Sequence, residues 1–204
     1  MTSKEKWNAR YRAATGGRQA SRVLEENLHL LPVNGRALDL ACGAGGNAML
    51  LAQQGLKVAA WDIADVAIAA LQDAALRRQF PVQAVVRDVE ANPPAPETFD
   101  VIVVSHFLRR DIIPALIQAL KPGGLVYYQT FIQQRVSHRG PERMEFRLAE
   151  QELLHLFSGL QVLFYREEGR VGNLQKGFRD EAMLIARKKG RTGHTGSTSG
   201  TNGS

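Results

Sequence analysis

Cysteine and long apolar runs are both scarce in this sequence. The chain of 204 residues has one cysteine, so it forms no internal disulfide and no cysteine-rich metal site. No apolar stretch reaches the roughly 18 residues that a membrane helix needs. The polar first 17 residues lack the apolar core of a secretory signal. We therefore expect a cytoplasmic protein with no membrane segment and no bound metal.

Acidic residues are outnumbered, but the excess of positive charge is local. The net charge is +6, and RKKGR over 187–191 carries four positive charges and no negative one. The residues after it are Gly, Ser, Thr, Asn and one His, which cannot bury apolar surface. We expect 190–204 to be a flexible tail. Because the charge is concentrated there, nucleic acid is not the expected partner.

Apolar strand-type runs alternate with helix-type segments through most of the chain. We expect five such strands, at 36–42, 57–63, 82–89, 99–107 and 125–131. We expect helices between them at 46–55, 65–80 (with Asp65 as its N-cap) and 111–124 (ended by Gly123-Gly124). An amphipathic helix at 147–157 then precedes two strands, 160–169 and 180–188, with no helix between them.

This alternation predicts an α/β fold. We expect a doubly wound, Rossmann-like, mostly parallel seven-stranded sheet with helices on both faces and a C-terminal antiparallel strand pair. The strands are apolar throughout, as strands covered on both faces are. We divide the chain into a helical N-terminal segment or lid (1–35), a main domain (36–189) and the tail (190–204).

A glycine-rich turn follows the first expected strand. LDLACGAGGN (38–47) sets Asp39 in an apolar run and then places three glycines within four positions. GAGGNA (43–48) fits the G-x-G-x-x-A pattern of dinucleotide sites, and Asp62 ends the second strand, where it can accept ribose hydroxyls. Nicotinamide and S-adenosylmethionine sites share both features, so these features alone do not discriminate.

Three further features favour S-adenosylmethionine. Asp39 would repel a pyrophosphate but attract an α-ammonium group, directly or through water. Asp88 ends the third expected strand and can accept the exocyclic amine of adenine, while Val89 presents backbone to the ring. LKPGGLVYYQTF (120–131) adds a glycine turn that leads straight into the fifth strand.

Five segments in the right order carry a family resemblance. LDLACGAGGN, AWDIA, RDVE, FDVIVVSHF and LKPGGLVYY, within 36–131, resemble the successive motifs of class I S-adenosylmethionine-dependent methyltransferases. WNARYR (7–12), FRLAEQELLHLF and EAMLIARK are similar to the tellurite-resistance and thiopurine methyltransferase-like branch. In that branch an N-terminal segment folds over the cofactor, and here it contains Trp7, Arg10 and Tyr11. The resemblance makes 36–189 a methyltransferase domain.

The resemblance also implies which residues bind the cofactor. They are Tyr11, Asp39, Ala41, Cys42, Gly43, Gly45, Asn47, Asp62, Ile63, Asp88, Val89 and Ser105. The glycine turn contacts the amino-acid end, Asp62 takes the ribose hydroxyls, and Asp88 holds the adenine edge. Ser105 lies near the methionine part, and His106 faces the acceptor side.

Several of these residues also have simpler explanations. Asp39 and Asp62 could be ordinary strand-end carboxylates, and Asp88 could only cap a turn. The side chain of Cys42 suits a glycine turn because it is small, without a nucleophilic role. His106, at the mouth of the fourth strand, is the candidate general base, or else it forms a wall of the pocket.

A long polar connection, QQRVSHRGPERMEFR (133–147), follows the fifth strand and should lie above the ligand edge of the sheet. Its basic side chains are those of Arg135, His138, Arg139, Arg143 and Arg147. One interpretation is a lid that binds an anionic acceptor, and the other is a solvated basic loop.

We expect an enzyme that transfers a methyl group from S-adenosylmethionine to a small molecule by in-line displacement. Candidate acceptors are a thiol, a chalcogen oxyanion or another anionic compound. The alternatives are a non-catalytic S-adenosylmethionine-binding protein, an NAD(P)-dependent oxidoreductase, which would need a Tyr–Lys pair that we do not find, and an RNA methyltransferase. Against the last, VSHF (104–107) stands where amino-group enzymes have an Asn/Asp-Pro-Pro-aromatic motif. The sequence carries no signal for an oligomeric state.

Overall fold

The computed structural model describes residues 2–13 and 19–190. The predicted tail lies outside these residues apart from Gly190, and so does part of the predicted N-terminal segment. The strands are β1 (Arg36–Leu40), β2 (Lys57–Asp62), β3 (Val82–Val86), β4 (Phe99–Ser105), β5 (Leu120–Phe131), β6 (Gln161–Glu167) and β7 (Glu181–Arg187). The α-helices are α1 (Ser3–Ala13), α2 (Arg22–Glu25), α3 (Gly46–Gln53), α4 (Asp65–Arg78), α5 (Ile113–Ala119) and α6 (Glu152–Leu156). Short 3₁₀ turns lie at Leu28–Leu30, Arg110–Ile112 and Met144–Phe146.

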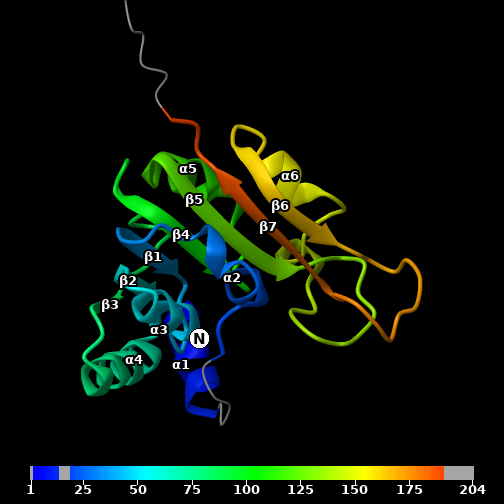
Figure 1. Cartoon of the computed structure of the whole chain (residues 1–204). Coiled ribbons are helices and arrows are strands. Elements are labelled where there is room, and N and C mark those ends of the chain that lie inside the picture. The colour runs from blue at the N-terminus through cyan, green and yellow to red at the C-terminus, as the bar shows by residue number, and fades with distance from the viewer. Residues whose placement is uncertain (1, 14–18, 191–204) are drawn as a thin grey trace, which may run out of the picture.

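The strands form a 7-stranded sheet in the order β3-β2-β1-β4-β5-β7-β6 (Figure 1). All neighbouring pairs are parallel except β5–β7 and β6–β7, which are antiparallel. The predicted mixed, doubly wound sheet is therefore confirmed. The strand order reverses between β1 and β4, and a crevice at the carboxyl ends of these two strands is where such sheets bind ligands.

Apolar side chains pack on both faces of the sheet. Leu38 and Leu40 of β1 pack in a core that includes residues of α5 and α6, while Ala37 packs in a second core with α2, α3 and α4. The same alternation along β4 sends Ile102 to the first core and Val103 to the second. Figure 1 shows these two groups of helices on opposite sides of the sheet. The continuous apolar runs follow from this double coverage.

The end of the third predicted helix was wrong. The helix stops at Ala119, and β5 begins at Leu120 instead of Leu125. Leu120 pairs with Phe99, and the register then shifts, so Gly123 lies inside the strand with φ 83°. Strand pairing on both sides of β5 overrides the local helix-stop signal.

Two other helix boundaries also differ from the prediction. Only 152–156 of the expected helix at 147–157 is helical, because Leu148 forms a bridge with Ile132 instead. Asp65 is the first residue of α4 and not its cap, which is Ala64. The Asp65 carboxylate pairs with Lys4 of α1 at 2.9 Å.

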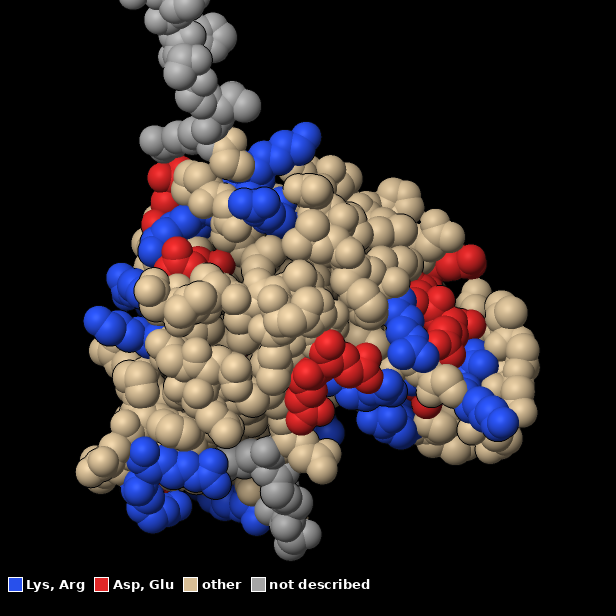
Figure 2. All heavy atoms as spheres, in the orientation of Figure 1, with Lys and Arg blue, Asp and Glu red and all other residues tan. Residues whose placement is uncertain are grey.

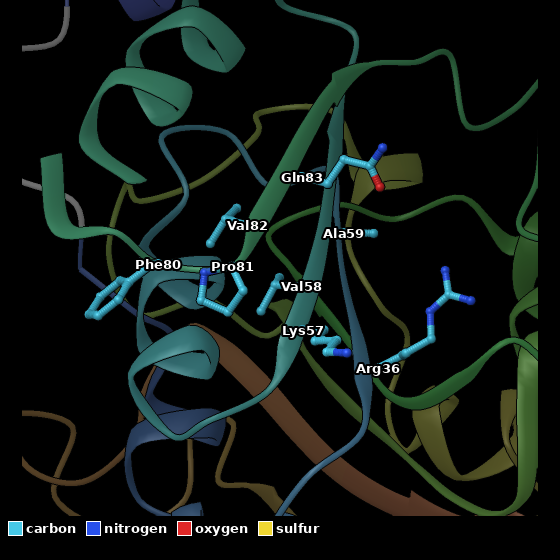
Figure 3. A pocket seen from close by; sticks show the side chains of 8 residues that line it. All are labelled: Arg36, Lys57, Val58, Ala59, Phe80, Pro81, Val82 and Gln83. Carbon is cyan, nitrogen blue, oxygen red and sulfur yellow. The ribbon is translucent and has the colours of Figure 1, made fainter. Parts of the chain in front are cut away.

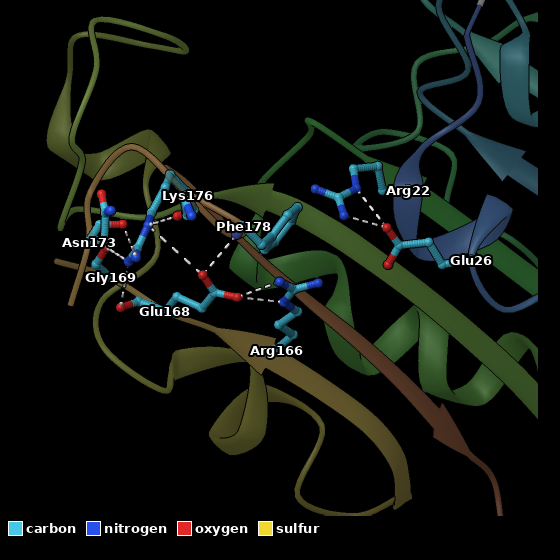
Figure 4. Close-up of polar contacts among 9 residues, drawn as sticks. Arg22, Glu26, Arg166, Glu168, Gly169, Asn173, Lys176 and Phe178 are labelled. Carbon is cyan, nitrogen blue, oxygen red and sulfur yellow. Dashed lines mark hydrogen bonds and ion pairs between the residues drawn. The ribbon is translucent and has the colours of Figure 1, made fainter. Parts of the chain in front are cut away.

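The segment that contains α2 packs against the C-terminal half of the sheet. Val23 and Leu24 are fully buried, and Phe178, in the β6–β7 connection, is 3% exposed. The guanidinium groups of Arg22 and Arg166 lie 5.1 and 5.6 Å from the Phe178 ring centre (Figure 4). These contacts hold α2 against this half of the sheet.

Within the described residues, no helix is long and apolar enough to cross a membrane. The cytoplasmic location stays a prediction.

Candidate functional site

The turn after β1 is tight and brings other segments close. Ala41, Gly43 and Gly45 have φ values of 55°, 52° and 81°. A Cβ on Gly43 would lie 2.5 Å from the Tyr11 hydroxyl, and one on Gly46 would lie 2.1 Å from the Gln19 carbonyl oxygen. Glycine is therefore required where the N-terminal segment crosses the start of α3.

Asp39 is a fully buried carboxylate at the carboxyl end of β1. It accepts hydrogen bonds from the Ala48 N–H at 2.9 Å and from Asn47 Nδ2 at 3.4 Å, so it caps the first turn of α3 from a neighbouring strand. Burial raises its pKa to about 7, although these hydrogen bonds oppose the shift. A cation placed beside Asp39 would favour the charged form and relieve this cost.

Asp62 lies at the end of β2 and is 6% exposed. Its Oδ2 accepts from the Gly43 N–H at 2.8 Å, and its Oδ1 accepts from the Ala64 N–H at 2.9 Å. Burial raises the pKa of this carboxyl, and the bonds from Ala64 and Gly43 lower it. Asp62 thus ties the β1 turn to the start of α4. The next residue, Ile63, is half-buried, and Cys42 is buried in the turn.

The first helix lies against this turn. Tyr11 of α1 stacks on Trp7 with ring centres 6.0 Å apart, and Arg10 covers the Trp7 ring at 5.2 Å. Burial and the nearby Asp62 carboxylate raise the pKa of Tyr11 far above its ordinary value. The WNARYR segment is therefore beside the glycine turn, and its role over the cofactor stays a prediction.

Asn47 connects three segments through its side chain. Its Nδ2 donates to Ser105 Oγ, at the end of β4, at 2.9 Å. Its Oδ1 accepts from the Ser21 N–H at 2.8 Å and from Ser21 Oγ at 2.9 Å. Together with its contact to Asp39, this joins the ends of β1 and β4 to the N-terminal segment. The structure thus brings together the predicted residues on the amino-acid side of the site.

The predicted adenine contacts are arranged differently. Because β3 ends at Val86, Asp88 lies beyond the strand and is exposed. Its Oδ1 accepts from the N–H groups of Glu90 and Ala91 at 3.0 and 3.3 Å, which is the turn-capping role. Val89 is buried in the same core cluster as Trp61. The adenine role of Asp88 and Val89 stays a prediction.

A polar cluster that the sequence reasoning missed lies beside His106. Its buried centre is Glu181, 2% exposed, at the start of β7. Glu181 Oε2 lies 3.1 Å from His106 Nε2 and 2.6 Å from Gln129 Nε2, and Oε1 lies 3.1 Å from Arg139. Burial alone would raise the pKa of Glu181, but the bonds from His106 and Gln129 and the charge of Arg139 hold it below its ordinary value. His106 has φ 55°, and its ring lies 5.0 Å from that of Phe131.

The connection 133–147 is partly structural. Arg147 is fully buried and donates to the carbonyl oxygens of Ile132, Arg139 and Pro141, so this side chain is neither solvated nor open to an anionic acceptor. This arginine is buried because the loop folds back over it. Asp180 accepts bonds from the Val136 and Ser137 N–H groups and from the Ser137 hydroxyl, which anchors the start of the loop.

A hollow lies at the opposite, amino-terminal edge of the sheet (Figure 3). Its lining includes the first residues of β1, β2 and β3 and the preceding Phe80 and Pro81. None of the predicted site residues lines it, so it is separate from the candidate site. Among residues 2–13 and 19–190, no group of three His, Cys, Asp or Glu side chains could hold a metal.

The charged side chains do not form one continuous basic face in the view of Figure 2. Lys and Arg gather in separate groups, interrupted by acidic groups and by a broad uncharged area. This distribution lends no support on that face to a nucleic-acid surface.

A family model described as "Methyltransferase domain" matches residues 37–124. "Hemagglutinin 1" from Eikenella corrodens is 32% identical over 141 residues, covering 65% of this chain and 46% of that protein. "Probable S-adenosyl-L-methionine-dependent methyltransferase TehB" from Haemophilus influenzae is 30% identical over 169 residues, covering 76% of this chain and 57% of that protein. The chain thus spans about half the length of these curated relatives.

The crystal structure of TehB from Haemophilus influenzae has the same fold, with a TM-score of 0.67 and 24% identity, over 91% of this chain and 67% of that one. Residues 37–124 thus match the methyltransferase-domain family, and the chain has the fold of TehB. TehB is one relative that this chain resembles both in sequence and in fold.

Proposed function

We propose that the protein is an S-adenosylmethionine-dependent methyltransferase that acts on a small molecule. The observation that carries the proposal is the pair of buried carboxylates, Asp39 and Asp62, on either side of the glycine turn. The residues present fit the cofactor. Asp39 is fully buried and accepts hydrogen bonds from the Ala48 N–H and from Asn47 Nδ2, so an α-ammonium group would supply the positive charge that these neutral donors lack. A pyrophosphate would add negative charge at the same place.

The chain's own groups would bind and orient the cofactor. Asp39 would hold the α-ammonium group, Asp62 the ribose hydroxyls, and Ser105 would lie beside the methionine part. Tyr11 and its helix would cover the turn and exclude water. When bound, S-adenosylmethionine supplies the electrophilic methyl group, so the protein's task is alignment of the acceptor with the methyl carbon and sulfur.

The acceptor would bind beyond the end of β4. His106 is the candidate base there, and Arg139 is the candidate for an anionic group, because it is 66% exposed in its side chain. Thiols, chalcogen oxyanions and other anionic compounds therefore remain the proposed acceptor classes. A soft anionic acceptor would need Arg139 more than His106, whereas a protonated acceptor would need His106.

The test is formation of S-adenosylhomocysteine from S-adenosylmethionine with a thiol, selenite or tellurite as acceptor, followed by mass spectrometry. Turnover that Asp62→Ala abolishes and that Asp73→Ala, on the exposed face of α4, leaves unchanged would support the proposal. Cofactor binding without turnover on any of these acceptors would favour the non-catalytic alternative.

A further inference from the structure

Glu181 is a buried acidic residue placed behind a half-exposed histidine. The His106 side chain is 42% exposed, and that of Glu181 is 3% exposed. The two residues are 75 positions apart in the chain and meet because β7 lies beside β5, next to β4. A buried carboxylate behind an accessible imidazole is the arrangement that orients a histidine in acid–base chemistry.

The hydrogen bonds around Glu181 decide which ring nitrogen of His106 carries the proton. The Val23 N–H, which can only donate, points to Gln129 Oε1 at 2.8 Å. The Gln129 amide is thereby oriented with its Nε2 toward Glu181 Oε2, at 2.6 Å. That oxygen must accept from Gln129, and Arg139 donates to the other oxygen. Glu181 is therefore an acceptor on both oxygens, and His106 Nε2 must donate to it.

From this network we infer that Glu181 is a positioning residue that fixes His106 as the Nε2–H tautomer, which leaves Nδ1 as the proton-accepting atom. The inference rests on the proposed function and extends it to the acceptor. A fixed base serves an acceptor whose attacking atom carries a proton, such as a hydroxyl or thiol group. The acceptor's lone pair forms the bond to the methyl carbon, the carbon–sulfur electron pair stays on sulfur, and the acceptor's proton passes to Nδ1.

The same network reaches the N-terminal segment. The Val23 N–H that orients Gln129 is two residues from Ser21, whose N–H and hydroxyl bind Asn47 at the cofactor side. The packing of residues 21–23 thus orients the Gln129 amide, and the Gln129 amide in turn donates a hydrogen bond to Glu181. The acceptor-side tautomer is coupled in this way to the segment that borders the glycine turn.

The test is nitrogen NMR of the full chain labelled with ¹⁵N-histidine, at about pH 8.5, well above the ordinary histidine pKa of about 6.5. His106→Gln assigns the signal of His106. We expect the wild type to show at least about a tenfold excess of the Nε2–H form, since hydrogen bonds to charged groups are stronger than those between neutral groups. In Glu181→Met, which keeps a side chain of similar length without the acceptor, both tautomers should be populated.

The exposed Glu145→Met variant is the matched control and should behave as the wild type. If His106 of the wild type is mainly the Nδ1–H tautomer, the inference is wrong, and this result needs no variant. An unchanged tautomer in Glu181→Met would also overturn it. Titration of the same wild-type sample with S-adenosylmethionine separates the two claims, because absence of binding would count against the proposed function while the tautomer still decides the role of Glu181.

Discussion

Replacement of Asp39 by asparagine should make the ligand-free protein more stable above neutral pH. The buried Asp39 carboxyl has its pKa raised from 3.8 to about 7. At about 1.36 kcal/mol per pH unit, this shift corresponds to about 4 kcal/mol. That is a large share of the roughly 5–15 kcal/mol that stabilises an ordinary domain. Asparagine keeps an oxygen for the Ala48 N–H, which Asp39 accepts at 2.9 Å, and carries no charge.

The sign follows from proton uptake. Between about pH 4 and pH 7 the folded protein holds a proton on Asp39 that the unfolded chain has released, so stability falls as pH rises through this window. Below the window both states are protonated and the effect vanishes. The free energy of unfolding of Asp39→Asn minus that of the wild type should therefore grow by up to about 4 kcal/mol from pH 4 to pH 8.

Urea unfolding followed by tryptophan fluorescence at several pH values from 4 to 8 measures this difference, because Trp61 is buried. Titrating groups that do not interact with Asp39 cancel between wild type and variant. The exposed Asp73→Asn variant should show a difference that does not depend on pH. Parallel curves for Asp39→Asn and the wild type would mean that Asp39 takes up no proton on folding in this window. The stabilised variant should also bind S-adenosylmethionine at least about tenfold more weakly, the expected cost of removing a functional charge.

Two further substitutions test the scaffold of the site, each by urea or thermal unfolding. Gly46→Ala should cost about 1–3 kcal/mol, because its Cβ would lie 2.1 Å from the Gln19 carbonyl oxygen, whereas Gly159→Ala meets nothing within 4 Å and should be nearly neutral. Arg147→Met should cost about 2–4 kcal/mol by leaving three carbonyl oxygens without their donor, whereas the exposed Arg143→Met should not. An equal loss in each pair would contradict these assignments.

The sheet could be predicted from the sequence because its physical cause is local. Strands buried on both faces must be apolar at every position, as Val101, Ile102 and Val103 show by packing alternately into two cores. The start of β5 could not be predicted in this way. Leu120 joins the strand because of partners elsewhere in the chain, and the Gly123 N–H pairs with the Lys188 carbonyl oxygen at 2.9 Å.

The clustering of Asp39, Asp62 and the glycine turn was predictable for a similar reason. Asp39 and Asp62 lie at strand ends that a parallel sheet brings to one edge, next to a glycine turn that is visible in the sequence. The acceptor side depends on long-range packing. In the sequence, Glu181 is an acidic residue before an apolar run, and only the pairing of β7 with β5 brings it beside His106. Arg147 has the sequence context of a solvated charge, and only the folding of its loop buries it.

Calorimetric titration of the purified protein with S-adenosylmethionine, S-adenosylhomocysteine and NADH would show which cofactor the glycine turn binds. We expect binding of the two sulfur ligands, loss of that binding in Asp62→Ala, its retention in Asp73→Ala, and no heat from NADH. Binding of NADH alone would contradict the account, since it would mean that the glycine turn accepts a pyrophosphate beside Asp39.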